Sequence, residues 1–231
     1  MIAGVKMKKI IVCFISASVF LYSGCQYGGL MSIIGTPGHY EKTIPAEYDL
    51  NQHADKKILV LVNQPNWLDI QANLRFSLTE AISKNLREGV EFPEGNIVSY
   101  DELSEFRSGK SDFSLLLPAE VGEALNADLV LLVALESCRF DVMGESGYYR
   151  GALNAQVVLI DVPSGDKVWP ESANSKAIKV GFEIEDRKRE VAAARLVAAL
   201  AYCTTRYLYD CPKAKFRIAD DRSSIGWESW D

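Results

Sequence analysis

Two short, uninterrupted runs of apolar residues limit the folds open to this chain more than any other feature. Residues 58–62 read Ile-Leu-Val-Leu-Val between Lys56-Lys57 and a polar stretch, and residues 129–135 read Leu-Val-Leu-Leu-Val-Ala-Leu. A run of this length, bounded by charges and turn residues, is typical of a strand with both faces buried. Because helices must then cover both faces of the sheet, the two runs predict an α/β fold.

Helical patterns occupy the segments around these runs. Apolar residues recur every four positions over 70–86, and Gly89 follows as the expected C-cap. The segment 99–106 begins with the capping-box spacing Ser-x-x-Glu, and Pro at the start of 118–125 is typical of a first helical turn. Residues 186–209 are rich in Ala and nearly free of helix breakers, which predicts a long C-terminal helix.

Alternating patterns after the second run predict antiparallel strands. We expect the turn of a hairpin at 140–150, which holds two glycines, and its return strand at 152–161. The sequence Pro-Ser-Gly-Asp at 163–166 predicts a second turn, with strands at 167–169 and 177–184 after it.

The order of the elements predicts the topology of the sheet. A strand, a helix, a short strand at 96–99 and further helices precede the second apolar run, so a crossover connection and parallel neighbours are expected early in the chain. The later meander implies antiparallel pairs. We therefore predict a single α/β domain over residues 56–211, with a mixed parallel and antiparallel sheet flanked by helices and a long C-terminal helix.

The first 25 residues have the features of an export signal. Lys6, Lys8 and Lys9 precede an apolar run at 10–21, and the small residues Ser23-Gly24 stand before Cys25. This pattern resembles a bacterial lipoprotein signal, with Tyr22 where that family prefers Leu. The resemblance implies that the leader is removed before the cysteine, that the thiol is diacylated, and that the acyl chains anchor the protein to a membrane.

Two interpretations of the leader stay open. In the first, residues 1–24 are a lipoprotein signal and the mature chain begins at Cys25. In the second, the leader is a plain secretory peptide that is cut without lipidation. An uncleaved anchor is disfavoured, because a membrane-spanning helix needs about 20 apolar residues and this run is shorter.

The segments on either side of the domain have loop-like compositions. Residues 25–55 are rich in Gly, Pro and isolated polar residues, which predicts a tether whose part 44–50 docks on the domain. Residues 212–231 form a charged tail. Position 26, directly after Cys25, is Gln and not the aspartate that retains lipoproteins on the inner membrane of enteric bacteria. We therefore expect a periplasm-facing protein of the cell envelope, with the outer membrane favoured.

Charge limits the classes of partner. The formal charge of the chain is −6, and removal of the leader takes away three lysines and no acids, which moves it to −9. An acidic domain repels phosphate backbones, so nucleic-acid binding is not expected. Cys138, Cys203 and Cys211 remain after the leader and Cys25, and their spacing selects no disulfide pair, so buried thiols are expected.

No motif predicts catalysis, a metal or a cofactor. The two histidines, His39 and His53, fall in the tether, and Gly109-Lys110-Ser111 lacks the earlier glycine of a phosphate loop because position 104 is Ser104. Carboxylates with the potential to pair are expected to be solvated or to cap helices instead; they are Asp101, Glu102, Glu105, Glu183, Glu185 and Asp186.

A recurring set of short motifs is similar to envelope lipoproteins of the curli-secretion, penicillin-binding-protein-activator and TolB amino-terminal-domain-like group. An Ala-Asp dipeptide leads into a strand, and a Leu-x-Asp-x-x-Ser-Gly turn is followed by a tryptophan. The residues concerned are Ala127, Asp128, Leu159, Asp161, Ser164, Gly165 and Trp169. The resemblance spans roughly residues 56–209 and implies a tethered α/β module that docks on another envelope protein or, less often, on a small molecule.

Three function hypotheses follow. The leading one is a non-enzymatic, membrane-anchored lipoprotein that acts as a protein-binding or scaffold module, with Tyr148, Tyr149 and Arg150 as the possible partner contact. The tyrosines would otherwise simply cover the end of a twisted hairpin. The alternative is a periplasmic small-molecule-binding or transport-accessory lipoprotein, and a polar-lined pocket would favour it. An enzyme would require carboxylates that converge in a cleft.

Overall fold

A computed structural model describes residues 43–65, 68, 73–93, 95–143, 148–185 and 189–212, with only the backbone described at 142–143, 148, 182–185, 189 and 212. All of these residues belong to one compact unit, Lys42–Asp231. The predicted signal, Cys25 and most of the predicted tether and tail lie outside the described residues.

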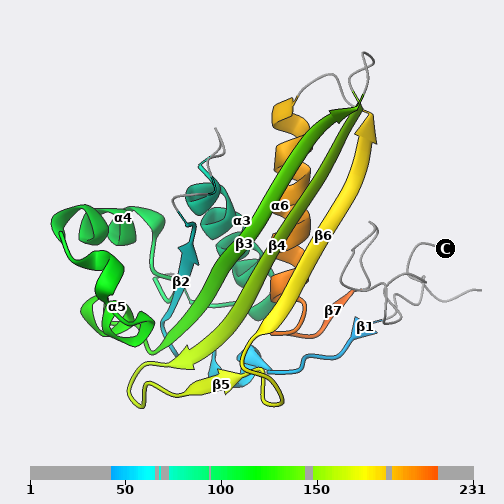
Figure 1. Ribbon diagram of the computed structural model, residues 1–231. Helices are drawn as coiled ribbons and strands as arrows, with labels where there is room; N and C mark the ends of the chain where they lie inside the picture. The colour runs from blue at the N-terminus through cyan, green and yellow to red at the C-terminus, as the bar shows by residue number, and fades with distance from the viewer. Residues whose placement is uncertain are drawn as a thin grey trace, which may run out of the picture. The chain divides into compact units, whose positions relative to one another are not determined.

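The core of the unit is a mixed parallel and antiparallel sheet, as predicted, and it has five strands (Figure 1). Its strand β2 is parallel to β3, whereas β3 and β4 form an antiparallel hairpin. Strands β5 and β6 both pair antiparallel with β4, β5 near its carboxyl end and β6 along the rest. The strands are β2 (Ile58–Asn63), β3 (Leu129–Met143), β4 (Tyr148–Asp161), β5 (Lys167–Trp169) and β6 (Lys176–Glu185).

Helices cover the two faces of the sheet unequally (Figure 1). The long helices α3 (Leu74–Val90) and α6 (Arg189–Thr205) pack side by side against one face. The short helices α4 (Tyr100–Gly109) and α5 (Pro118–Ala124) lie on the other face, beside β2 and the start of β3. Among the described residues, no helix combines the length and apolarity needed to cross a membrane.

Alternate residues of the apolar runs feed two separate hydrophobic clusters. Ile58, Val60 and Val62 of β2 belong to a large cluster under α3 and α6, whereas Leu59 and Leu61 belong to a small cluster under α4 and α5. The five side chains are at most 7% exposed. The prediction of a strand buried on both faces is therefore confirmed for β2, and its continuous apolar sequence follows from the two covering layers.

Helix α3 does not end where its glycine indicated. The predicted C-cap Gly89 lies inside the helix, and Glu91 at φ 55° is the C-cap. A Cβ atom at position 89 would lie 2.4 Å from the ring of Tyr209, so the glycine is needed for close packing and not for a turn. The expected strand at 96–99 is reduced to a single parallel bridge between Ile58 and Ile97.

The β3–β4 hairpin is longer than predicted. We expected its turn at 140–150, but β3 continues to Met143 and β4 starts at Tyr148. The rings of Phe140 and Tyr149 stack across the two strands, with centroids 5.2 Å apart. Because aromatic cross-strand pairs stabilise antiparallel strands, this contact extends the hairpin past the expected turn.

The C-terminal helix is shorter than predicted. We expected it over 186–209, whereas α6 ends at Thr205. The chain then forms the two-residue strand β7 (Cys211–Pro212), which pairs antiparallel with β1 (Thr43–Ile44). This pair makes a second, two-stranded sheet that no sequence pattern indicated.

The segment before the main sheet packs on the domain. Leu50 opens the 3-10 helix η1 (Leu50–His53) and is fully buried in the large cluster. A carboxylate oxygen of Glu47 accepts a hydrogen bond from the indole of Trp169 at 3.0 Å, and its other oxygen lies 2.6 Å from the ammonium group of Lys176. The expected docking of 44–50 is thus observed.

The motif residues have structural roles. A carboxylate oxygen of Asp128 accepts a hydrogen bond from the backbone N–H of Lys57 at 2.7 Å, which ties the start of β3 to the start of β2. Asp161 accepts hydrogen bonds from the hydroxyl group of Ser164 at 2.9 Å and the ammonium group of Lys56 at 3.2 Å. Gly165 adopts φ 72°, a conformation that favours glycine, in the predicted turn.

Candidate ligand-binding pocket

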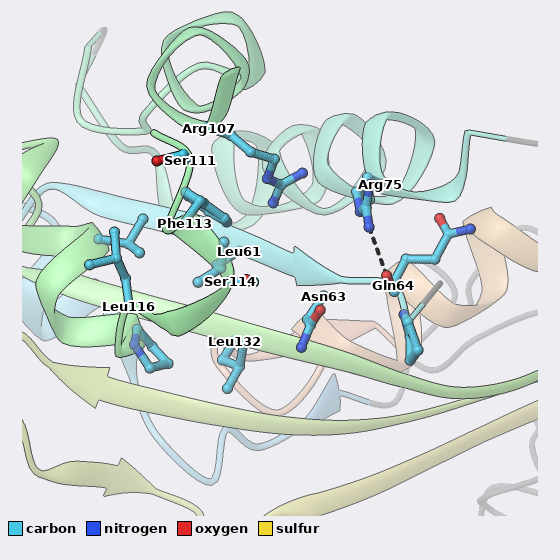
Figure 2. A pocket seen from close by; sticks show the side chains of 13 residues that line it. Leu61, Asn63, Gln64, Arg75, Arg107, Ser111, Phe113, Ser114, Leu116 and Leu132 are labelled. Atoms are coloured by element: carbon cyan, nitrogen blue, oxygen red, sulfur yellow. Dashed lines mark hydrogen bonds between the residues drawn. The ribbon is translucent and has the colours of Figure 1, made fainter. Parts of the chain in front are cut away.

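A pocket of about 560 Å³ opens beside the carboxyl end of β2 (Figure 2). Its walls come from β2, from helices α3, α4 and α5, from the 3-10 helix η2 (Phe113–Leu115) and from one side chain of β3. Pockets of this size are typical of small-molecule sites. The lining residues are Leu61, Asn63, Gln64, Pro65, Arg75, Arg107, Ser111, Phe113, Ser114, Leu116, Pro118, Val121 and Leu132.

The position of the pocket follows from the chain path around β2. Helix α3 connects β2 to the bridge residue Ile97 over one face of the sheet, and α4 and α5 lead from there to β3 over the other face. Where the connections from two adjacent parallel segments leave toward opposite faces, a crevice opens beyond their carboxyl ends, and ligands bind there in α/β proteins. The pocket lies at this point.

Arg75 reaches the pocket from the first turn of α3. Its guanidinium Nη2 donates a hydrogen bond to the backbone oxygen of Gln64 at 2.7 Å, which holds the side chain at the end of β2 (Figure 2). The first turn of α3 contains no acidic residue. Because the amino end of a helix carries a partial positive charge, the helix adds to the charge of Arg75 rather than opposing it.

Arg107 reaches the same pocket from the last turn of α4. Its guanidinium carbon lies 4.7 Å from the centroid of the Phe113 ring, a cation–π arrangement. Burial lowers the pKa of Arg107, and the charge of Arg75 lowers it further. Two guanidinium groups therefore lie half-buried in one pocket, where each disfavours the charged form of the other.

The lining contains positive charge without a balancing carboxylate. Arg75 and Arg107 are among the 13 lining residues, and none of these residues is Asp or Glu. The amide of Asn63 and the hydroxyl groups of Ser111 and Ser114 add polar atoms, and apolar side chains such as Leu61 form the rest of the wall. The pocket is therefore cationic within a chain of net charge −6.

The predicted partner contact is only partly described. The side chain of Tyr148 lies outside the described residues, as does Cys25. Tyr149 is half-buried through its stack with Phe140, and Arg150 is exposed, opposite Asp141 of β3 and Glu183 of β6 in the strand register. This arrangement does not form a contiguous site with the pocket, and a partner contact at 148–150 stays a prediction.

The other candidate residues from the sequence contribute to local structure and packing rather than to the pocket. His53 stacks on Tyr48 with ring centroids 5.4 Å apart, and Glu102 completes a capping box with Ser99 at the start of α4. Cys203 and Cys211 are buried thiols, and Cys138 is half-buried. Within the described ranges, no group of three His, Cys, Asp or Glu side chains is placed to hold a metal ion.

Neither arginine of the pocket was predicted from the sequence. A signal was present, because Arg75 stands in the first turn of a helix that follows a buried strand, and an arginine there opposes the usual preference for acids. Arg107 carried no such signal. It meets Arg75 only through the way that α4 packs over β2.

No family model matches the sequence, and no curated protein matches it. Solved structures that resemble it include lipoprotein GNA1162 from Neisseria meningitidis (14% identity, 63% of this chain and 95% of that chain, TM-score 0.42). A minor lipoprotein from Acinetobacter baumannii shares 10% identity over 68% and 96% of the two chains, with a TM-score of 0.37.

A third similar structure is the LpoB C-terminal domain from Salmonella enterica, with 18% identity, coverage of 62% and 86%, and a TM-score of 0.30. Two of these three structures are thus described as bacterial lipoproteins. At TM-scores this low the likeness assigns neither a function nor a partner to this chain.

Proposed function

We propose that the protein is a non-enzymatic lipoprotein of the cell envelope whose α/β domain binds a small molecule in the pocket beside β2. The pocket is the observation that carries this proposal, because its volume and its mixture of polar and apolar walls match those of small-molecule sites. The leader that ends at Cys25 supports the anchor and the envelope location.

The ligand-binding part is tested by filling the pocket. Ser114 is exposed and lines the pocket, so Ser114→Trp places an indole there without disturbing a buried side chain. We expect native mass spectrometry of protein purified from envelopes to show a bound small molecule in the native chain and none in the variant. The neighbouring Leu115 is 81% exposed and does not line the pocket, so Leu115→Trp is a matched control. Equal occupancy of all three proteins would refute the proposal.

The anchor is tested separately at the predicted lipidation site. Cys25→Ala should abolish labelling by a fatty-acid analogue and release the protein to the soluble fraction, because no acyl chain is then attached. Cys13→Ala removes a cysteine from the leader and should leave labelling unchanged. Labelling of the Cys25→Ala variant would contradict the site.

A second candidate function is protein binding along the open edge of the sheet. Among the described strands, β6 pairs only with β4, so the other edge of its ten residues is left without a neighbour. An edge of this kind accepts an added strand from a partner. This candidate retains the scaffold role that the sequence favours.

A photo-crosslinking amino acid tests the edge directly. Lys179 is exposed in the middle of β6, and Lys84 is exposed on α3, which is not part of the sheet. A benzophenone side chain at position 179 should capture an envelope protein in intact cells, whereas the same group at position 84 should not. Identical capture at both positions would show contact without specificity.

A further inference from the structure

The charge of the pocket identifies the class of its ligand. We infer that Arg75 and Arg107 together bind the anionic head, a carboxylate or phosphate group, of a small amphiphilic molecule whose apolar part lies against the leucine side chains of the pocket. This inference rests on the proposed ligand-binding function and names the chemistry that the same pocket would select.

The two arginines are placed to bind one group. They come from different helices, α3 and α4, and Figure 2 shows both guanidinium groups directed toward the end of β2. Because both arginines line this one pocket, the charge of Arg75 also lowers the pKa of Arg107. A planar guanidinium presents parallel N–H donors that match the oxygens of a carboxylate or phosphate, so a pair of them favours one anion between them.

Neither arginine is neutralised by a described carboxylate. Arg75 donates to a neutral backbone oxygen, and Arg107 lies over an aromatic ring. Asp112 stands between Ser111 and Phe113 in the sequence but is not one of the lining residues. Two half-buried cations in this arrangement repel each other and lose hydration, and an anionic ligand removes both costs.

The remaining walls determine the rest of the ligand. Leu61, Leu116 and Leu132 lie on the side of the pocket away from Arg75 (Figure 2). Apolar surface of this kind gains free energy by covering a hydrocarbon group. A free inorganic anion would leave the half-buried side chains of Leu116 and Leu132 uncovered, so an amphiphile fits better than phosphate alone.

Simple probes test the inference on the full chain carrying Cys25→Ala, which avoids detergent. We expect isothermal titration calorimetry to detect octanoate and octyl phosphate, with octanol and octyltrimethylammonium at least about tenfold weaker. Inorganic phosphate should bind more weakly than octyl phosphate, because it lacks the apolar part. Octanol binding as strong as that of octanoate would overturn the inference.

Charge-removing variants locate the head group. Arg107→Gln and Arg75→Gln should each weaken octanoate by about tenfold or more, whereas octanol binding stays unchanged. Arg87 is exposed in the last turn of α3 and does not line the pocket, so Arg87→Gln is the control for net charge. If Arg87→Gln weakens octanoate binding as much as Arg107→Gln does, the loss reflects the net charge of the protein and not a contact in the pocket, and the inference fails.

The outcomes separate this inference from the proposed function. If Ser114→Trp abolishes probe binding but the arginine variants and the charge of the probe have no effect, the pocket binds ligands and the anionic class is wrong. If no probe binds and Ser114→Trp changes nothing in the envelope-purified protein, the proposed function itself fails.

One further arm identifies the source of the anion. Co-sedimentation with vesicles of phosphatidylcholine and phosphatidylglycerol, lost in Arg107→Gln but not in Arg87→Gln, would identify a lipid head group as the ligand. Probe binding without co-sedimentation would identify a free amphiphile. Both results support the shared chemistry.

Discussion

The two faces of the sheet differ in how completely they are covered. On one face, α3 and α6 bury the large cluster along most of the length of β3 and β4. On the other face, α4 and α5 cover only β2, the start of β3 and the carboxyl end of β4, and the small cluster beneath them borders the pocket. One face therefore holds most of the buried apolar core, and the incomplete cover of the other leaves room for the pocket.

The outward face beyond α4 and α5 is polar rather than apolar. The amide of Asn154 donates to the hydroxyl oxygen of Ser137 at 2.8 Å, and the amide of Gln156 donates to a carboxylate oxygen of Glu136 at 2.9 Å. Such cross-strand pairs are stable in contact with water. The long strands therefore need no helix on this side.

Two adjacent leucines on opposite faces of β3 are expected to differ most in how much they contribute to the free energy of unfolding. Leu131 is fully buried in the large cluster, whereas Leu132 is half-buried in the wall of the pocket. Leu131→Ala should lower the free energy of unfolding by about 2–5 kcal/mol, because it leaves a cavity in a close-packed core. Leu132→Ala should cost clearly less, since the pocket already borders that side chain.

Urea denaturation of both variants measures this pair. Equal losses of unfolding free energy would contradict the difference between the two faces, because they would show that the face with the pocket is packed as tightly as the other.

Gly151 on β4 and Gly181 on β6 differ in how tightly they are packed against their neighbours. A Cβ atom at position 151 would lie 2.3 Å from a methyl carbon of Leu196, whereas at position 181 its nearest neighbour would be 3.4 Å away. Gly151→Ala should destabilise the protein by about 1–3 kcal/mol, since it pushes α6 away from β4. Gly181→Ala should change little.

Thermal denaturation followed by circular dichroism distinguishes the glycine variants. If Gly151→Ala melts at the temperature of the native protein, helix α6 is more loosely packed on the sheet than the structure shows.

The contact of Glu47 joins the N-terminal segment to the face covered by α6. Glu47→Gln keeps a hydrogen-bond acceptor for the Trp169 indole but loses the charge that pairs with Lys176. Because the pair is partly exposed, we expect a loss of about 1 kcal/mol or less in the free energy of unfolding. Limited proteolysis near residue 47 should become faster, and an unchanged rate would contradict the role of this contact.

The smallest effect on stability is expected for Asp161, the last residue of β4. Burial opposes ionisation of Asp161, but hydrogen bonds from Ser164 and Lys56 outweigh it and lower its pKa below the usual 3.8. A lowered folded-state pKa stabilises the protein above pH 3.8, and this contribution is lost as the pH falls below that value.

Asp161→Asn should therefore reduce stability by less than about 1 kcal/mol at neutral pH and flatten the loss of stability in acid. Urea midpoints measured at neutral pH and below pH 3.8 test this expectation. An acid dependence identical to that of the native chain would show that other carboxylates account for it.

The better-covered face was also the more predictable one. Continuous apolar runs and helical periodicity are local signals, so β2, α3 and the mixed sheet followed from the sequence. The length of the hairpin did not, because the stack between Phe140 and Tyr149 joins two residues that the sequence pattern assigns to the turn.

The pocket was not predictable because it depends on how separate helices pack together. Arg75 and Arg107 line it from two different helices, and the ring of Phe113 lies against the guanidinium group of Arg107. None of these contacts is local in the sequence. The docked segment around Leu50 was easier, because an isolated apolar group in a polar stretch must find a core to join.

The small sheet of β1 and β7 places Thr43 opposite Pro212, so the chain enters and leaves the described body at one place. A short peptide linking these two positions would close the backbone into a ring, and the ring could be cut between Met143 and Tyr148 while every strand keeps its neighbours. The domain is thus a natural candidate for circular permutation, with engineered ends at the tip of the long hairpin.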